Sequence, residues 1–202
     1  FRQLTGAKAT FVQLEADTAY YQSSPQTPTQ DFVLCVGRDV GRDFETLFEA
    51  LVATGIPAKV VASAHRVRGM DIPKNIELHT EKVDYETLMD WYHQARLVIV
   101  NLQEIHRFTG QRALLEALAM GKATVAARTQ ALTSTYSLVD GSDVVYYEPG
   151  NASDLAQKIQ HVYDDQEKLR ALGLNARRFV ESIPEGSFYY GVRKLCVESL
   201  DD

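Results

Sequence analysis

Six short apolar segments alternate with amphipathic segments of helical length, and this alternation is the strongest constraint on the fold. The apolar segments are rich in Val and Ile and mostly lack a polar–apolar alternation, which is typical of parallel strands covered on both faces. The sequence therefore predicts six strands of a mostly parallel sheet: Phe32–Val36, Ala58–Ala62, Ile76–His79, Leu97–Asn101, Ala123–Ala127 and Val144–Tyr147.

Helical patterns fill most of the intervals between these strands and continue after the last one. Gly55 and Gly121 each follow such a pattern directly, and a glycine just past a helix is a common stop signal. Strand–helix alternation through short connections indicates an α/β fold, a three-layer α/β/α sandwich. The predicted helices are Asp43–Ala53, Tyr85–Ala95, Gly110–Met120, Ser153–Tyr163, Glu167–Ser182 and Phe188–Leu200.

The composition argues against several classes of protein. The chain of 202 residues carries a net charge of −6 and no run of Lys or Arg, so we expect no nucleic acid partner. No segment approaches the roughly 18 consecutive apolar residues of a membrane span, so we expect no transmembrane segment. We also expect no signal peptide. Cys35 and Cys196 are far apart and are predicted to be reduced core thiols, which favours a cytoplasmic protein.

A loop rich in glycine and arginine directly follows the first predicted strand. Its sequence, GRDVGRD (37–43), contains Arg38 and Arg42. Parallel α/β proteins bind ligands outside the carboxyl ends of their strands, and glycine lets a backbone approach an anion closely. The loop is therefore a candidate anion site with two cations. A glycine turn whose arginines pair with Asp39 and Asp43 explains the same residues.

A second candidate site lies in TGQRALLEALAMG (109–121). A helix that begins near Gly110 offers unpaired N–H groups and the positive end of its dipole, and the glycine leaves room for a phosphate. Thr109 can equally be a simple N-cap. Glu116 stands one turn beyond Arg112 in an otherwise apolar stretch, where it suits the ribose hydroxyls of a nucleotide. The alternative is an Arg112–Glu116 ion pair.

Motifs of other enzyme classes are missing from the sequence. It has no G-x-S-x-G, no GxxxxGK[ST] and no GxGxxG pattern, which argues against hydrolases, P-loop enzymes and dinucleotide enzymes. It also lacks an Asp-x-Asp pair for a metal-bound diphosphate. The histidines show no zinc-ligand spacing, and they are His65, His79, His93, His106 and His161. We therefore predict no metal site.

The order of these segments resembles the C-terminal, donor-binding half of a GT-B glycosyltransferase, and most of all the retaining group 1 family (family 4). The resemblance covers residues 32–182, and its most specific parts are LLEALAMGKATVA (114–126) and LGLNARRFVE (172–181). The segment ATFVQLEADTAYY (9–21) is similar to the chain that joins the two GT-B domains. The resemblance implies a Rossmann-like sandwich that binds a UDP- or GDP-sugar without a metal or other cofactor.

Site residues follow from this resemblance by position. Glu116 resembles the second Glu of the Glu-x7-Glu motif, which holds the ribose. The N–H groups around Thr109, Gly110, Gln111 and Arg112 would meet the diphosphate. The loop from His79 to Val83 lies where backbone groups usually contact the base. The charge of the leaving diphosphate would be neutralised by Arg38 and Arg42, which resemble the family's Arg and Lys but stand closer together.

The chain also departs from the family pattern. The first Glu of the motif falls on Phe108, so the usual contact to the donor sugar is absent, and Glu104 is a candidate substitute. The loss favours an alternative function, a non-catalytic nucleotide-binding or interaction module. A sugar-nucleotide epimerase of the same fold would need more acid–base residues than the sequence offers.

The predicted organisation has three parts. Residues 1–30 are expected to be an interdomain segment with a strand-like run, Ala9–Leu14, and a polar linker, SSPQTPTQ (23–30). Residues 31–183 form the nucleotide-sugar-binding domain and residues 184–202 a C-terminal helix. An acceptor (a glycan, a lipid or a small molecule) would be bound by a separate N-terminal domain, and peripheral membrane contact is compatible with this organisation.

Overall fold

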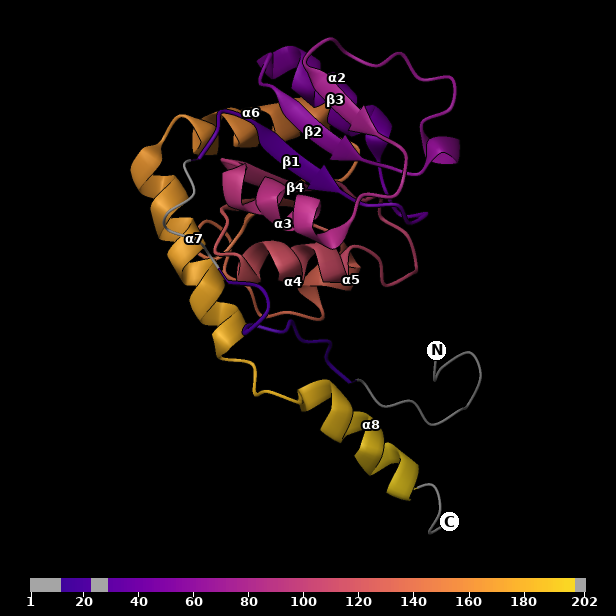
Figure 1. Cartoon of the computed structure of the whole chain (residues 1–202), viewed down its shortest axis with the longest axis vertical. Coiled ribbons are helices and arrows are strands. Elements are labelled where there is room, and N and C mark those ends of the chain that lie inside the picture. Colours follow the sequence, from indigo (N-terminus) through magenta and orange to yellow (C-terminus); the bar gives the residue numbers. More distant parts are fainter. Residues whose placement is uncertain (1–11, 23–28, 199–202) are drawn as a thin grey trace.

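A computed structural model of the chain describes residues 12–22 and 29–198 (Figure 1). Its six strands form one sheet in the order β3-β2-β1-β4-β5-β6. All five neighbouring pairs are parallel, so the predicted mostly parallel sheet is wholly parallel in this part of the chain. The strands are β1 (Val33–Val36), β2 (Ala58–Val61), β3 (Ile76–His79), β4 (Leu97–Val100), β5 (Thr124–Ala127) and β6 (Val145–Tyr147).

Helices connect the strands and complete the chain. The predicted helices are present, with ends within two residues of the expected ones wherever the structure describes them; the predicted end at Leu200 lies outside the described residues. Two short elements were not predicted, the 3-10 turn η1 (Ala64–Arg66) and α5 (Gln130–Thr133). The others are α2 (Phe44–Thr54), α3 (Tyr85–Gln94), α4 (Gln111–Ala119), α6 (Ala152–Tyr163), α7 (Gln166–Glu181) and α8 (Ser187–Glu198).

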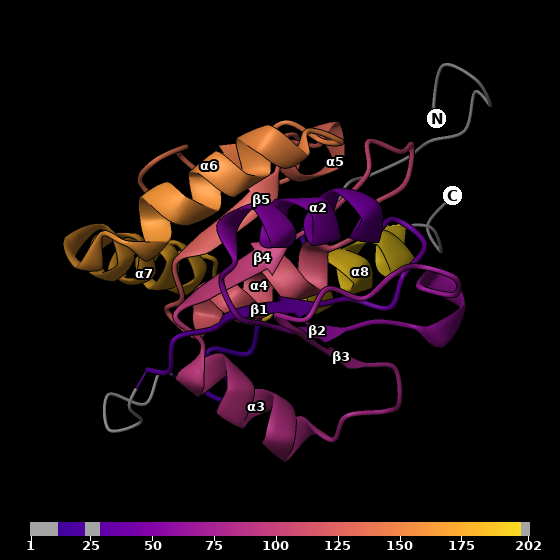
Figure 2. The ribbon, with the colours of Figure 1, turned by 90° about the horizontal axis from the view of Figure 1, so that it is seen from above.

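The helices cover both faces of the sheet. Figure 2 shows α2 and α6 above the strands and α3 below them. The alternation along β1 explains the two layers: Val33 and Cys35 pack in the core with α2 and α6, whereas Leu34 packs with Tyr92 of α3 and Ala117 of α4. The predicted three-layer, Rossmann-like sandwich is therefore confirmed.

Two expectations about the ends of the chain are wrong. Residues 12–14 of the predicted strand Ala9–Leu14 have no strand pairing, and the rest of that run lies outside the described residues, as does most of the predicted linker. Neither Cys35 nor Cys196 forms a disulfide in the described part of the chain, but only Cys35 is a core thiol, because Cys196 is exposed on α8. The apolar residues around Cys196 predict a helix, but they do not show whether another element packs on that helix. The exposure of Cys196 was therefore not predicted.

The segment 12–22 lies against the helical layer rather than in the sheet. Arg177 of α7 donates hydrogen bonds to the carbonyl of Thr18 at 3.0 Å, to the carbonyl of Tyr21 and to the carbonyl of Ala119 at the end of α4. Glu15 accepts a hydrogen bond from the amide of Ser187 at the start of α8 at 2.8 Å. One arginine thus joins this segment to both α4 and α7.

A Gly173→Ala substitution is expected to destabilise the chain by about 1–3 kcal/mol, because overpacking forces backbone shifts. A Cβ at Gly173 of α7 would lie 2.2 Å from the carbonyl oxygen of Gly121, in the turn after α4. Chemical denaturation measures the loss. Arg170→Ala, on the exposed side of α7, is the control and should stay within about 0.5 kcal/mol. Equal stabilities of the two variants would contradict this close contact.

Candidate functional site

The two glycine-containing loops predicted to bind an anion lie side by side at the carboxyl edge of the sheet. A Cβ on Gly41 would lie 2.3 Å from the hydroxyl oxygen of Thr109, and Gln103 donates to the carbonyl of Gly41 at 2.8 Å. A Cβ on Gly37 would lie 2.0 Å from Nε of Arg42. The glycines of the 37–43 loop therefore permit close packing within the protein, and not only the approach to an anion that the sequence predicts.

The N-terminus of α4 carries unpaired amides. The first hydrogen bond of this helix runs from the amide of Leu114 to the carbonyl of Gly110, so the amides of Gln111, Arg112 and Ala113 precede it without a partner in the described structure. The N-cap is Gly110, with a φ of 74° and no side-chain cap, and the alternative that assigns the cap to Thr109 is wrong. Three amides and the positive end of the dipole thus face outward from α4.

The reason for Gly110 also differs from the prediction. A Cβ at this position would lie 2.7 Å from a methyl carbon of Leu102, which is fully buried. The missing side chain therefore points into the core and not toward a phosphate. The glycine sets the direction of α4 and its close approach to Leu102.

Arg42 is a buried cation beside this helix end. Its side chain is 3% exposed, and its Nε donates to Asp39 at 2.8 Å. Its Nη1 has no hydrogen-bond partner among the described residues, although it is buried. The predicted alternative, a pair with Asp39, is thus present but leaves the Nη1 amino group of a buried guanidinium without a hydrogen-bond partner, which is costly without a ligand.

Arg38 is exposed and has a different role in this structure. It donates to the carbonyls of Thr80 and Glu81 at 2.9 Å each, and so joins the 37–43 loop to the loop after β3. Asp43 does not pair with either arginine; it caps α2 by accepting from the amide of Thr46 at 3.2 Å. The structure therefore brings Arg38 to the predicted base-contacting loop, and places only Arg42 in the buried position beside α4.

Glu116 is 7% exposed and accepts hydrogen bonds from two tyrosines. The Tyr21 hydroxyl donates to Oε1 at 2.9 Å, and the Tyr92 hydroxyl donates to Oε2 at 3.3 Å. Burial raises the pKa of this carboxyl, while the two hydroxyl groups and the charges of Arg112 and Arg42 act in the opposite direction. The described residues include no Arg112–Glu116 ion pair, so that alternative is wrong.

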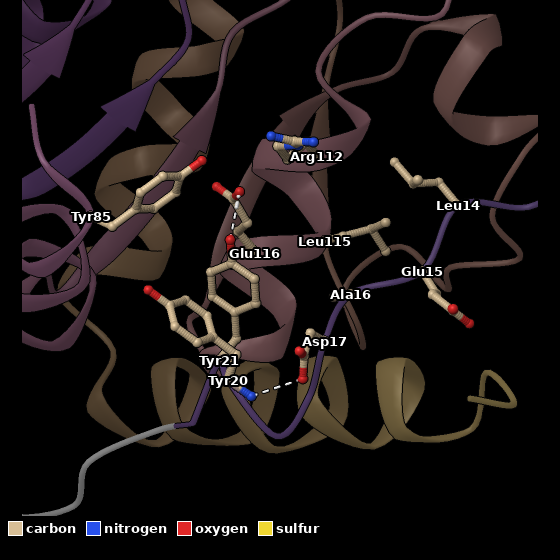
Figure 3. Close-up of a pocket in the computed structure, with 10 residues that line it drawn as sticks. All are labelled: Leu14, Glu15, Ala16, Asp17, Tyr20, Tyr21, Tyr85, Arg112, Leu115 and Glu116. Atoms are coloured by element: carbon tan, nitrogen blue, oxygen red, sulfur yellow. Dashed lines mark hydrogen bonds between the residues drawn. The ribbon is translucent and has the colours of Figure 1, made fainter. Parts of the chain in front are cut away.

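A cavity of about 390 Å³ opens at Glu116. Figure 3 shows that it lies between the 14–21 segment, the start of α3 and one face of α4. Arg112 lines it at the end near the N-terminus of α4, and Tyr85 lines it from α3. Its lining residues are Leu14, Glu15, Ala16, Asp17, Tyr20, Tyr21, Tyr85, Arg112, Leu115 and Glu116.

The other predicted site residues lie outside this cavity. His79 contacts Trp91, with ring centroids 4.4 Å apart, and its Nε2 lies 2.7 Å from Glu77. Val83 is half-buried in the loop before α3. Phe108 is 65% exposed. Glu104 accepts from the amide of Gln130 at 2.9 Å, which engages it at the start of α5.

Sequence reasoning missed Tyr21, Tyr92 and Tyr85 as parts of the site. Tyr92 falls in a predicted apolar helix face, where a tyrosine is usually core. Tyr21 ends the segment that resembles the interdomain connection, and this was the only signal that it lies near the site. Their meeting at Glu116 spans 95 residues of sequence for Tyr21 and 24 for Tyr92.

The described residues contain neither a candidate metal cluster nor a helix that could span a membrane. Among the described residues, no group of three or more His, Cys, Asp or Glu side chains is arranged to hold a metal ion. In the same part of the chain, no helix combines the length and the apolar character needed to cross a bilayer.

Several solved structures of glycosyltransferases are similar to the chain. The C-terminal domain of a group 1 glycosyl transferase, LpcC from Francisella tularensis, aligns with a TM-score of 0.67 at 17% identity, over 83% of this chain and 97% of that domain. HepE from Anabaena, solved in complex with UDP and glucose, aligns with a TM-score of 0.74 at 16% identity, over 92% of this chain and 56% of HepE. The chain thus spans about half of HepE.

A third solved structure has the same fold over part of its length. Sucrose-phosphate synthase from Thermosynechococcus elongatus aligns with a TM-score of 0.65 at 19% identity, over 85% of this chain and 46% of the synthase.

No curated protein matches the sequence significantly. A family model described as glycosyl transferase-like matches residues 40–183. The chain therefore belongs to the glycosyl transferase-like family and has the fold of the C-terminal domain of GT-B glycosyltransferases.

Proposed function

We propose that this chain is the donor-binding part of a retaining, metal-independent glycosyltransferase of family 4. It moves a hexose from a UDP- or GDP-sugar to a glycan, lipid or small molecule held by a separate N-terminal domain. The observation that carries the proposal is the buried guanidinium of Arg42, whose Nη1 has no partner among the described residues, in the loop that contacts Thr109 just before the free amides of α4. A cavity with a carboxylate begins one turn farther along this helix.

The arrangement suits a nucleoside diphosphate. The diphosphate lies at the amides of Gln111 and Arg112, where the helix dipole and Arg42 stabilise its charge. Glu116 accepts the ribose hydroxyls, and the backbone from His79 to Val83 contacts the base. As the bond to the sugar breaks, negative charge grows on the leaving diphosphate, and fixed cations and amides stabilise it electrostatically.

Arg38 would complete this charge stabilisation. Its hydrogen bonds to the carbonyls of Thr80 and Glu81 break when the diphosphate binds, because a phosphate oxygen offers a stronger, charge-assisted hydrogen bond. The two arginines then replace a metal ion. We also propose a cytoplasmic location, because Cys35 and Cys196 form no disulfide in the described part of the chain, as is usual in a reducing compartment.

Calorimetry of the 202-residue chain tests this assignment. UDP or GDP should bind weakly, and uridine or guanosine more weakly still. Arg42→Gln should reduce the affinity for UDP about tenfold to a hundredfold, because a charge-assisted hydrogen bond contributes about 1.5–3 kcal/mol. The affinity for uridine should stay unchanged, which also shows that the variant is folded. Arg170→Gln, exposed on α7, is the matched control.

Other outcomes would contradict the assignment. If Arg42→Gln weakens uridine and UDP equally, Arg42 supports the fold rather than the diphosphate. If neither UDP nor GDP binds the wild-type chain, the site assignment is wrong. Efficient sugar transfer by this chain alone would refute the separate acceptor domain.

A non-catalytic nucleotide-binding module is the second candidate, and Phe108 is the residue that favours it. Phe108 is 65% exposed at the position where the family carries a carboxylate for the donor sugar. The two candidates differ in how they bind the sugar. An enzyme should bind UDP-glucose or another nucleotide sugar more tightly than UDP, whereas the module should bind both equally.

A further inference from the structure

The two tyrosines that donate to the Glu116 carboxylate differ in burial. Tyr92, on Oε2, is fully buried in the layer between α3, α4 and the sheet. Tyr21, on Oε1, is only half-buried and lines the cavity. A molecule in the cavity can therefore reach the Tyr21 side chain but not the Tyr92 side chain.

The Tyr21 side chain covers the carboxylate. Figure 3 shows its ring below Glu116, with the hydroxyl directed at the carboxylate. Tyr21 donates to Oε1 from the cavity side, because Tyr21 and Glu116 both line the cavity. A ligand hydroxyl that approaches Oε1 from the cavity therefore competes with the Tyr21 hydroxyl for this oxygen.

The backbone of Tyr21 is held independently of its side chain. Its amide donates to the carbonyl of Asp17 at 2.9 Å, and its carbonyl accepts from Arg177. The side chain can therefore rotate about its own bonds while the 12–22 segment stays docked on α4 and α7. The ring of Tyr20 packs edge-on against that of Tyr21, with the centroids 5.1 Å apart, and the cavity that both tyrosines line gives the Tyr21 ring room to move.

We propose that Tyr92 is a positioning residue that holds Oε2 of Glu116 permanently, and that Tyr21 occupies Oε1 only until a ribose hydroxyl of the donor replaces it. The inference rests on the proposed function, because it needs a nucleotide at Glu116. The bound hydroxyl takes over the hydrogen bond that Tyr21 gives up, so Glu116 never lacks a donor on either oxygen. In the absence of a nucleotide, Tyr21 thus occupies the oxygen that the ribose hydroxyl would use.

Nucleotide titrations of the full chain test this division. Tyr21→Phe should bind UDP roughly three- to tenfold more tightly than the wild type, because the Tyr21 hydroxyl no longer competes with the ribose for Oε1. Tyr92→Phe should bind UDP about tenfold more weakly and lose the preference for UDP over 2′-deoxy-UDP, because its carboxylate is no longer oriented. Tyr189→Phe, at an exposed tyrosine of α8 outside the cavity, is the matched control and should equal the wild type.

A crystal structure with UDP gives a second measurement that does not depend on the variants. The Tyr21 hydroxyl should lie beyond about 3.5 Å from Glu116 and the Tyr92 hydroxyl within hydrogen-bonding distance. Weaker binding by Tyr21→Phe, or a complex in which Tyr21 still contacts Glu116, would overturn the inference while leaving the proposed function intact. So would unchanged ribose preference in Tyr92→Phe. Failure of the wild-type chain to bind UDP or GDP would overturn both.

Discussion

Glu116→Gln is expected to lose about a hundredfold in affinity for UDP and yet to be more stable than the wild type at neutral pH. The affinity falls because the ribose hydroxyls donate to a carboxylate, and each hydrogen bond to a charged group contributes about 1.5–3 kcal/mol. A neutral amide accepts such bonds more weakly and presents only one oxygen. Calorimetry with UDP measures this loss.

The gain in stability follows from the pKa of Glu116. Burial raises this pKa in the folded chain above its unfolded value near 4.5. Folding therefore favours the protonated form, and the wild type loses stability as the pH rises from the unfolded pKa through the folded pKa. The glutamine has no charge to bury, so the difference in unfolding free energy should grow over this interval, by about 1.4 kcal/mol per unit of pKa shift, and stay constant above it.

Thermal unfolding at several pH values measures this trend. A gain of about 1 kcal/mol corresponds to a rise of roughly 2–4 °C in Tm for a chain of this size. The groups that face Glu116 are Tyr21, Tyr92, Arg112 and Arg42, and none of them is altered. Glu148→Gln, on the surface beyond β6, is the control for the loss of an exposed carboxylate, and its stability should stay within about 0.5 kcal/mol of the wild type. If Glu116→Gln is less stable at every pH, the buried carboxylate is a structural residue.

Gly110→Ala is expected to destabilise the chain by about 1–2 kcal/mol through its φ of 74° and by a further 1–3 kcal/mol through its contact with Leu102. An L-residue pays for the left-handed conformation, and its Cβ would meet a fully buried methyl carbon. Leu102 or the start of α4 must then move. UDP affinity should fall together with stability, because the amides of α4 change their direction.

Gly55→Ala is the matched control for this prediction. Gly55, the C-cap of α2, also has a positive φ, of 67°, but nothing lies within 4 Å of a Cβ there. It should therefore show only the conformational cost, about 1–2 kcal/mol, and unchanged UDP affinity. Denaturation curves of both variants separate the two contributions. Equal losses would mean that the contact with Leu102 carries no constraint.

The sheet and its helices could be predicted because each depends on a local pattern. Unbroken Val- and Ile-rich runs predicted the six strands, and Gly55 marked the end of α2 where the structure has its C-cap. The short turns η1 and α5 were missed, because segments this short carry no hydrophobic period. The mostly parallel sheet was predicted from the strand–helix alternation, whereas the order of the strands and the parallel pairing of all five neighbours were found only in the structure.

The candidate site was only partly predictable. The sequence placed the Arg38–Arg42 loop and the start of α4 at one edge of the sheet, and the structure confirms that they touch through Gly41 and Thr109. It could not show that the guanidinium of Arg42 is buried over Gly37 while that of Arg38 reaches two carbonyls after β3. Side-chain direction depends on neighbours that are remote in sequence.

Glu116 shows the same division most clearly. Its apolar surroundings in the sequence were enough to predict a buried carboxylate with a purpose, because an ionised group in an apolar helix is costly unless something binds it. Only the tertiary structure decided its partners, Tyr21 from the 12–22 segment and Tyr92 from α3. Local periodicity determines which residues form a helix and which of its faces is buried, whereas the partner of a buried charge is set by packing between segments that the sequence keeps far apart.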